Sequence, residues 1–173
     1  MPNWCECDLI ITGKEKELKA FVEFAKGEEE DNNEREAIMT TKFVPYPKEH
    51  ADIQKEIEDW HKANPGKTEW DGPKDWFNRG GRDWCIKNWG TKWGICHSEL
   101  VEEDYKYEEI TYAFDSAWSP PEPIILAMSK KFPELTFRMT YFEQGCQFNG
   151  IYECKAGEVL NEETGKYWGN RGG

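Results

Sequence analysis

Long hydrophobic runs are missing from this chain of 173 residues. No segment approaches the ~18 apolar residues that a membrane-spanning helix needs, so we expect no role in a membrane. The opening stretch MPNWCECDLIITG also lacks the basic and apolar segments of a secretory signal peptide. These absences lead us to expect a protein that acts in the cytoplasm.

Basic residues are scarce beside acidic ones. The chain has 22 lysines and arginines against 34 aspartates and glutamates, which gives a formal net charge of −12. Such a surface repels phosphate backbones unless a local basic patch intervenes, but it attracts and steers a basic protein. For the charge taken alone, plain solubility is the favoured interpretation. If the charge serves binding, we expect a basic protein as the partner ahead of nucleic acid.

The sequence also lacks the Cys and His spacings that are typical of zinc sites. The chain has 6 cysteines but no C-x-x-C pair, and Cys96 and His97 are adjacent, so on a strand they point to opposite faces. Cys5 and Cys7 alternate with apolar residues on one face of a predicted strand, where free cysteine behaves as a small hydrophobe. We predict reduced cysteines, no metal and no cofactor.

The hydrophobic periodicity indicates a mixed fold. It predicts strands at 3–12, 37–47, 93–104, 107–118, 134–145 and 146–157, and helices at 14–26, 48–64 and 120–132. Residues 65–87 lack clear periodicity and are expected to form an irregular insertion, and residues 161–173 a frayed tail. We therefore predict one α+β domain over residues 1–160, with a ferredoxin-like antiparallel sheet and helices on one face.

Several short blocks of the chain together resemble a known family. They are Asn3-Trp4-Cys5, the run NWGTKW from Asn88 to Trp93, AWSPP from Ala117 to Pro121, Phe132-Pro133, and then Tyr141, Glu143, Gly145, Phe148 and Gly150. In this order they resemble the YubB-like family of small proteins of phages and conjugative plasmids. The resemblance spans residues 2–157, and the chain departs from it at Gly94 and Ser116, where an acidic residue and threonine are expected. It implies a ferredoxin-like domain and a mobile-element origin in a bacterial host, but it supplies no catalytic residue.

One histidine is a candidate for acid–base chemistry. His97 and Glu99 lie two residues apart, so they can share one face of a strand, and Asp115 and Glu143 near strand ends could pair in the same way. The favoured interpretation is a strand histidine that a neighbour satisfies. No nucleophile with an adjacent base, G-x-S-x-G motif or P-loop is recognisable in the sequence. A small hydrolase or nuclease therefore stays an alternative.

Two other stretches are candidates for binding. Arg79 and Arg82 flank a pair of glycines, with Trp76 and Lys92 nearby, and such a segment can cradle an anion or stack on single-stranded nucleic acid. Pairing of these arginines with Asp71, Asp75 and Asp83 is the favoured interpretation. The second stretch is an acidic loop that contains Glu28, Glu29 and Glu30 and is suited to a basic partner.

The tryptophans of the NWGTKW and AWSPP blocks are expected to serve packing. Trp89, Trp93 and Trp118 are predicted to be buried in or near the core, because indoles bury a large area. Gly90 and Gly94 are then expected at positions where the backbone needs glycine.

The leading hypothesis for function rests on the acidic net charge and on the expected mobile-element origin. We expect a non-enzymatic accessory protein that binds a basic host protein, for example as an inhibitor of a defence nuclease such as a CRISPR effector. A nucleic-acid-binding module and a hydrolase or nuclease are the alternatives.

If the 6 cysteines are unligated thiols, the purified protein should carry no stoichiometric zinc. Elemental analysis measures this directly. Zinc that survives dialysis against a chelator contradicts the prediction.

Overall fold

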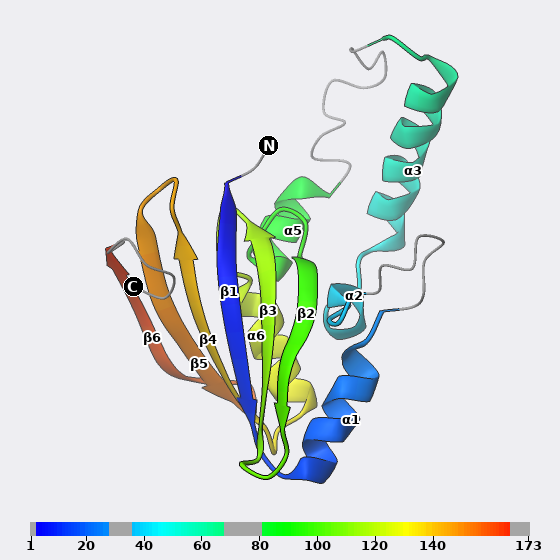
Figure 1. Cartoon of the computed structure of the whole chain (residues 1–173). Coiled ribbons are helices and arrows are strands. Elements are labelled where there is room, and N and C mark those ends of the chain that lie inside the picture. Colours follow the sequence, from blue (N-terminus) through cyan, green and yellow to red (C-terminus); the bar gives the residue numbers. More distant parts are fainter. Residues whose placement is uncertain (1–2, 28–35, 68–80, 167–173) are drawn as a thin grey trace.

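The structure, a computed structural model, describes residues 3–27, 36–67 and 81–166. The described residues form one six-stranded antiparallel sheet in the order β2-β3-β1-β4-β5-β6. Helices pack on one face of it, while the helix of residues 48–63 projects away from the sheet (Figure 1). The elements are β1 (Trp4–Thr12), α1 (Glu15–Ala25), α2 (Thr40–Phe43), α3 (Lys48–Ala63), α5 (Arg82–Trp89), β2 (Ile95–Asp104), β3 (Glu109–Ala117), α6 (Glu122–Lys131), β4 (Thr136–Glu143), β5 (Phe148–Lys155) and β6 (Glu158–Lys166). The predicted α+β class and antiparallel sheet are confirmed.

Strand β1 lies in the middle of the sheet and pairs with β3 on one side and β4 on the other. Its alternate residues are fully buried, as the sequence predicts, at Cys5, Cys7, Leu9 and Ile11. These side chains meet α1 and α6, whose apolar residues close the core on that face. Figure 1 shows α5 and α6 behind the strands, and none of the described helices covers the opposite face of the sheet.

The predicted strand at 37–47 is wrong. Residues Thr40–Phe43 form the short helix α2, and the segment is held by side-chain and backbone bonds instead of a ladder. The Ile95 amide donates to Thr40 Oγ1 at 2.9 Å, and the Met39 amide donates to the Ala25 carbonyl at 2.8 Å. Helix α2 packs beside α6, so tertiary contacts outweigh the strand preference of the β-branched residues in this segment.

Two other boundaries differ from the sequence prediction. Residues 82–87 belong to helix α5 and not to an irregular segment. Residues 161–166, expected in a frayed tail, form the second half of β6, which pairs with β5 out to Lys166. The segment has only a weak apolar pattern, so the sequence did not predict a strand. Its hydrogen bonds to β5 hold it in the sheet.

Of the three tryptophans predicted to be buried, the structure buries one. Trp89 is 7% exposed, and its indole nitrogen donates to the Val44 carbonyl at 3.0 Å. Trp93 and Trp118 are 44% and 48% exposed, so the prediction is wrong for both. The glycines of this stretch behave as expected, because Gly90 and Gly94 have φ of 77° and 79°, which favours residues without a Cβ.

Replacing Trp89 by alanine is expected to lower the free energy of unfolding by about 3–5 kcal/mol, because truncation leaves a cavity and an unpaired carbonyl. Trp93→Ala is the matched control and should cost less than about 1 kcal/mol, since its ring is already half in solvent. Chemical denaturation of both variants measures the difference. Equal losses would contradict this assignment of core and surface.

Candidate functional site

The uncovered face of the sheet carries an unusual set of side chains. In β1 the residues between the buried ones are Trp4, Glu6, Asp8 and Ile10. Residues directly opposite one another in a sheet share a face, so the register of each strand pair identifies the rest. We call this surface the open face, defined by these β1 residues and their cross-strand partners.

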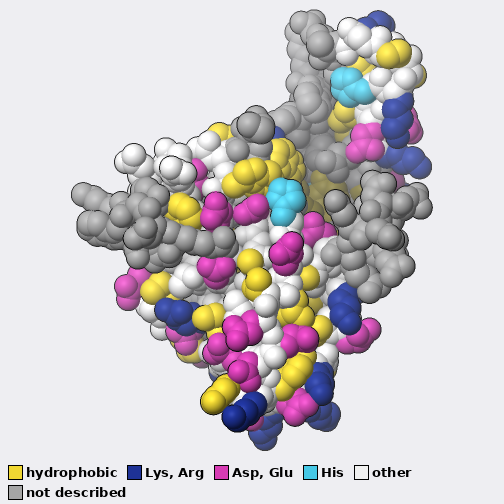
Figure 2. All heavy atoms as spheres, viewed as in Figure 1, with side chains coloured by type: hydrophobic (Ala, Val, Ile, Leu, Met, Phe, Trp, Pro, Cys, Tyr) yellow, Lys and Arg dark blue, Asp and Glu magenta, His cyan; other side chains and the backbone are white. Residues whose placement is uncertain are grey.

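Carboxylates dominate the open face. The register places there Glu6 and Asp8 of β1, Glu99, Glu102 and Asp104 of β2, Glu109 and Asp115 of β3, Glu153 of β5, and Glu158 and Glu163 of β6. Arg138 and Lys155 are the basic residues at the paired positions of the same face. Figure 2 shows acidic side chains spread across this surface, with lysine and arginine toward its borders. The face therefore carries a concentrated negative charge on a rigid scaffold.

An aromatic cluster lies at the end of the open face where β1 begins. The Trp4 ring contacts Trp93 at a centroid distance of 6.2 Å and His97 at 5.0 Å. His97 Nδ1 is 3.0 Å from Asp115 Oδ2, so the imidazole is held between an indole and a carboxylate. Aromatic surface beside a carboxylate suits a basic side chain of a partner, through ion pairing and cation–π contact.

The main chain beside His97 is fixed by a residue that precedes α2. His97 has φ of 52° and lies where the pairing of β2 with β3 changes register. The carboxylate of Glu36 accepts the amide of His97 at 3.1 Å and the amide of Ser98 at 2.7 Å, and it also accepts the Ser98 hydroxyl. These bonds hold the irregular edge of β2 in the shape that turns His97 toward Asp115.

The thiol next to this histidine is a poor nucleophile. Burial raises the pKa of Cys96 to about 11, and the carboxylates of Glu36 and Asp115 add to the rise. The group therefore stays a neutral thiol up to alkaline pH, and the His97–Asp115 pair has no thiolate at Cys96 to act upon.

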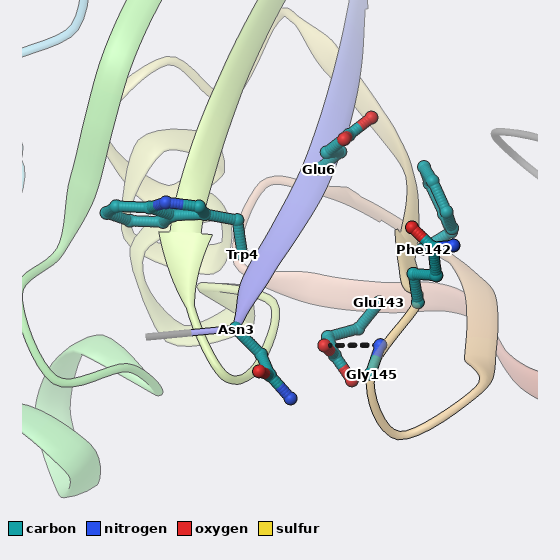
Figure 3. Close-up of a pocket in the computed structure, with 7 residues that line it drawn as sticks. Asn3, Trp4, Glu6, Phe142, Glu143 and Gly145 are labelled. Carbon is teal, nitrogen blue, oxygen red and sulfur yellow. Dashed lines mark hydrogen bonds between the residues drawn. The ribbon is translucent and has the colours of Figure 1, made fainter. Parts of the chain in front are cut away.

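A shallow pocket of about 380 Å³ opens beside the aromatic cluster (Figure 3). It is lined by Asn3, Trp4, Glu6, Phe142, Glu143, Gln144 and Gly145. Trp4 and Phe142 stand on opposite sides of it, and the Glu6 side chain projects between them. The pocket thus combines aromatic walls with carboxylate, which is the lining that a guanidinium or ammonium group would need.

Glu143 shapes this pocket from inside the fold. Its side chain is buried, and its carboxylate accepts the amide of Gly145 at 2.9 Å and the amide of Cys146. These bonds fix the turn between β4 and β5. A Cβ at Gly145 would meet the Asn3 side chain and the Glu143 carboxylate, so a larger residue here would require these side chains to move.

The structure brings together part of the set of candidate catalytic residues. His97 pairs with Asp115 across two strands, and not with Glu99 as the spacing suggested. Glu143 lies on the helix-covered side of the sheet, since it pairs with Cys5, so it does not join His97. The favoured interpretation, a histidine satisfied by a neighbour, agrees with this geometry.

The candidate binding residues fall in two groups. Arg79, Trp76, Glu28, Glu29 and Glu30 lie outside the described residues. Arg82 forms the predicted pair with Asp83, at 3.4 Å, and together with Lys92 it borders a second pocket near Trp118.

Sequence reasoning missed Trp4, Glu6, Asp8 and Glu36 as surface and site residues. A signal for the first three was present, because they alternate with Cys5 and Cys7 along the same strand. Glu36 carried no such signal, since its partners are more than sixty residues away.

In the described part of the chain, no group of three or more His, Cys, Asp or Glu side chains could hold a metal ion. Nor does any helix among those residues combine the length and the apolar character that crossing a bilayer requires.

Known proteins share this fold. Residues 88–167 match the family model described as the ferredoxin-like domain in Api92-like protein. The crystal structure of the protein api92 from Yersinia pseudotuberculosis is similar over 98% of this chain and 99% of that chain, with a TM-score of 0.59 and 12% sequence identity. At this identity the likeness shows the fold alone, and no curated protein matches the chain in sequence. The ferredoxin-like prediction is thereby confirmed.

Replacing Glu36 by alanine is expected to lower the free energy of unfolding by about 1–3 kcal/mol, because two amides and a hydroxyl lose a charged acceptor. Glu36→Gln keeps one acceptor oxygen and should lose less. Denaturation of both variants, with the His97 ring signals in NMR as a local readout, tests this. An unchanged His97 environment in Glu36→Ala would refute the role given to these bonds.

Proposed function

We propose that the chain is a non-enzymatic binding protein whose open face docks on a basic surface of a host protein. The main support is the high density of carboxylates on that face. Its paired positions carry only Arg138 and Lys155 as basic residues. A basic surface that normally binds nucleic acid is complementary to the carboxylates of the open face, because such a surface neutralises the regularly spaced charges of phosphates.

The rigidity of this array of carboxylates supports the proposal. Its carboxylates stand on paired strands about 4.8 Å apart, so their positions are set by the ladder and not by loops. Because the backbone beneath the charges is already ordered, binding needs no ordering of loops, and only the exposed side chains lose rotamer freedom. The aromatic cluster and the pocket beside Glu6 add anchors for individual basic side chains at one end of the face.

The chain's resemblance to the YubB-like family supports a more specific version. A protein of a phage or plasmid that occupies a nucleic-acid channel would inhibit a host nuclease in the bacterial cytoplasm. A defence nuclease, such as a CRISPR effector, is the partner class that we propose.

One observation favours a second candidate, a small hydrolase or nuclease. The imidazole of His97 lies 3.0 Å from the Asp115 carboxylate and is 63% exposed, so it is accessible to a substrate. The described residues give it neither a metal group nor a thiolate at Cys96, and we therefore rank this candidate below the binding protein.

Reversing charge on the open face should slow association with a purified CRISPR effector nuclease by about tenfold and weaken its inhibition, because these charges steer the encounter. The variant is Glu99→Lys/Glu102→Lys. The control is Glu49→Lys/Glu56→Lys, which changes the net charge equally but lies on the exposed surface of α3. Surface plasmon resonance at two salt concentrations measures the rates, and added salt should reduce the difference.

Three results would overturn the proposal. If both variants slow association equally, the net charge of the chain and not the open face governs the encounter. Micromolar binding of single-stranded oligonucleotide that Arg82→Ala abolishes would favour the nucleic-acid module. Hydrolysis of a phosphodiester substrate that His97→Ala abolishes would favour the enzyme.

A further inference from the structure

A second pocket, of about 410 Å³, lies where three segments of the chain meet. It is lined by Arg82 and Ile86 of α5, Thr91 and Lys92 of the following loop, and Ala117, Trp118 and Ser119 at the end of β3. The NWGTKW and AWSPP stretches, which are separate in sequence, both contribute to it. The charged residues that line this pocket are cations, whereas most charged residues of the open face are carboxylates.

The two loops of this pocket are tied to each other by hydroxyl groups. Thr91 Oγ1 donates to the Ala117 carbonyl at 2.8 Å, and Ser119 Oγ donates to the Gly90 carbonyl at 2.6 Å. Ser116 Oγ donates to the Ser119 carbonyl at 2.7 Å, which holds the second loop against β3. These bonds between the two loops hold them in one conformation. A ligand can then bind without a large loss of conformational entropy in the loops.

Trp118 is held in a strained and exposed position within this frame. Its φ is 73°, which is rare for a residue with a large side chain, and its amide donates to the Asn3 carbonyl at 3.0 Å. The ring is 48% exposed, and Ile86 on the facing helix is 43% exposed. Backbone strain that presents an indole to solvent, and not to the core, is a feature of binding sites.

Two cations border the same apolar surface. Arg82 is held near Asp83 at 3.4 Å, and the ammonium group of Lys92 lies 4.5 Å from the centre of the Trp93 ring. A guanidinium and an ammonium group beside an exposed indole can bind a phosphate while a planar ring stacks on the tryptophan.

We propose that this pocket binds a nucleotide, with the base against Trp118 and Ile86 and the phosphate between Arg82 and Lys92. The same chemistry occurs in a free mononucleotide and at the end of a single strand. The net charge of −12 opposes the approach of a polyanion, so the free mononucleotide is the expected ligand. This site borders the open face, because Ala117 is opposite Trp4 and Lys92 lies over Trp93, but the inference does not depend on the function proposed for that face.

Titration of the full chain with adenosine 5′-monophosphate, followed by calorimetry and by NMR of the indole N–H signals, tests the proposal. Saturable binding is expected, with a shift of the Trp118 signal. Trp118→Ala, and separately Arg82→Ala/Lys92→Ala, should each weaken binding about tenfold or more, and Trp118→Phe should restore much of the loss by stacking.

Matched controls replace similar side chains outside the pocket. Tyr107→Ala removes an aromatic ring that is 71% exposed, and Lys87→Ala removes another exposed cation of α5. Both should bind adenosine 5′-monophosphate as the unmodified chain does. If Trp118→Ala fails to fold, the Trp118 shift in the unmodified chain and the Arg82→Ala/Lys92→Ala variant still decide the question.

Several outcomes would overturn the inference. They are no saturable binding, equal binding by inorganic phosphate alone, or equal losses in the control variants. Tighter binding of an oligodeoxyadenylate than of the mononucleotide would overturn the assignment to a free nucleotide. Glu99→Lys/Glu102→Lys should leave nucleotide binding intact, so failure here and failure of open-face docking are separate results.

Discussion

The pairing of β1 along both of its edges is the constraint on which this structure depends. The strand lies between β3 and β4, and its alternate side chains are fully buried beneath the helices. Because pleating directs neighbouring residues to opposite faces, the burial of Cys5 and Cys7 forces Trp4, Glu6 and Asp8 onto the other face. A shift of one residue in register would bury carboxylates and expose the core.

The two faces of the sheet therefore have separate roles. The helix-covered face provides stability through buried aliphatic and aromatic side chains. The open face is left free to carry a charge that no core could hold, since a buried carboxylate needs partners such as the two amides that Glu143 has. The cationic pocket at Trp118 borders the open face where β1 begins, because Lys92 lies over Trp93, whose ring contacts Trp4.

Irregular backbone positions form the edges of both candidate sites. His97 and Trp118 have positive φ, and each is held by bonds from residues far away in sequence, Glu36 for the first and Asn3 for the second. Such bonds can stabilise conformations that an isolated strand would avoid. They explain why His97 meets Asp115 instead of Glu99, although the alternation along β2 suggested the nearer carboxylate.

The sequence by itself determined the fold class, most of the helices and strands, the buried alternation of β1 and the positions that need glycine, because these follow from local periodicity and backbone sterics. The acidic character of the chain was also evident from composition. Tertiary structure alone decided that Thr40–Phe43 is helical, that residues 161–166 complete β6, and that Trp93 and Trp118 face solvent while Trp89 does not. The physical reason is that long-range hydrogen bonds and packing partners, such as Ile95 for Thr40 and Val44 for Trp89, outweigh local preference, and no local pattern records them.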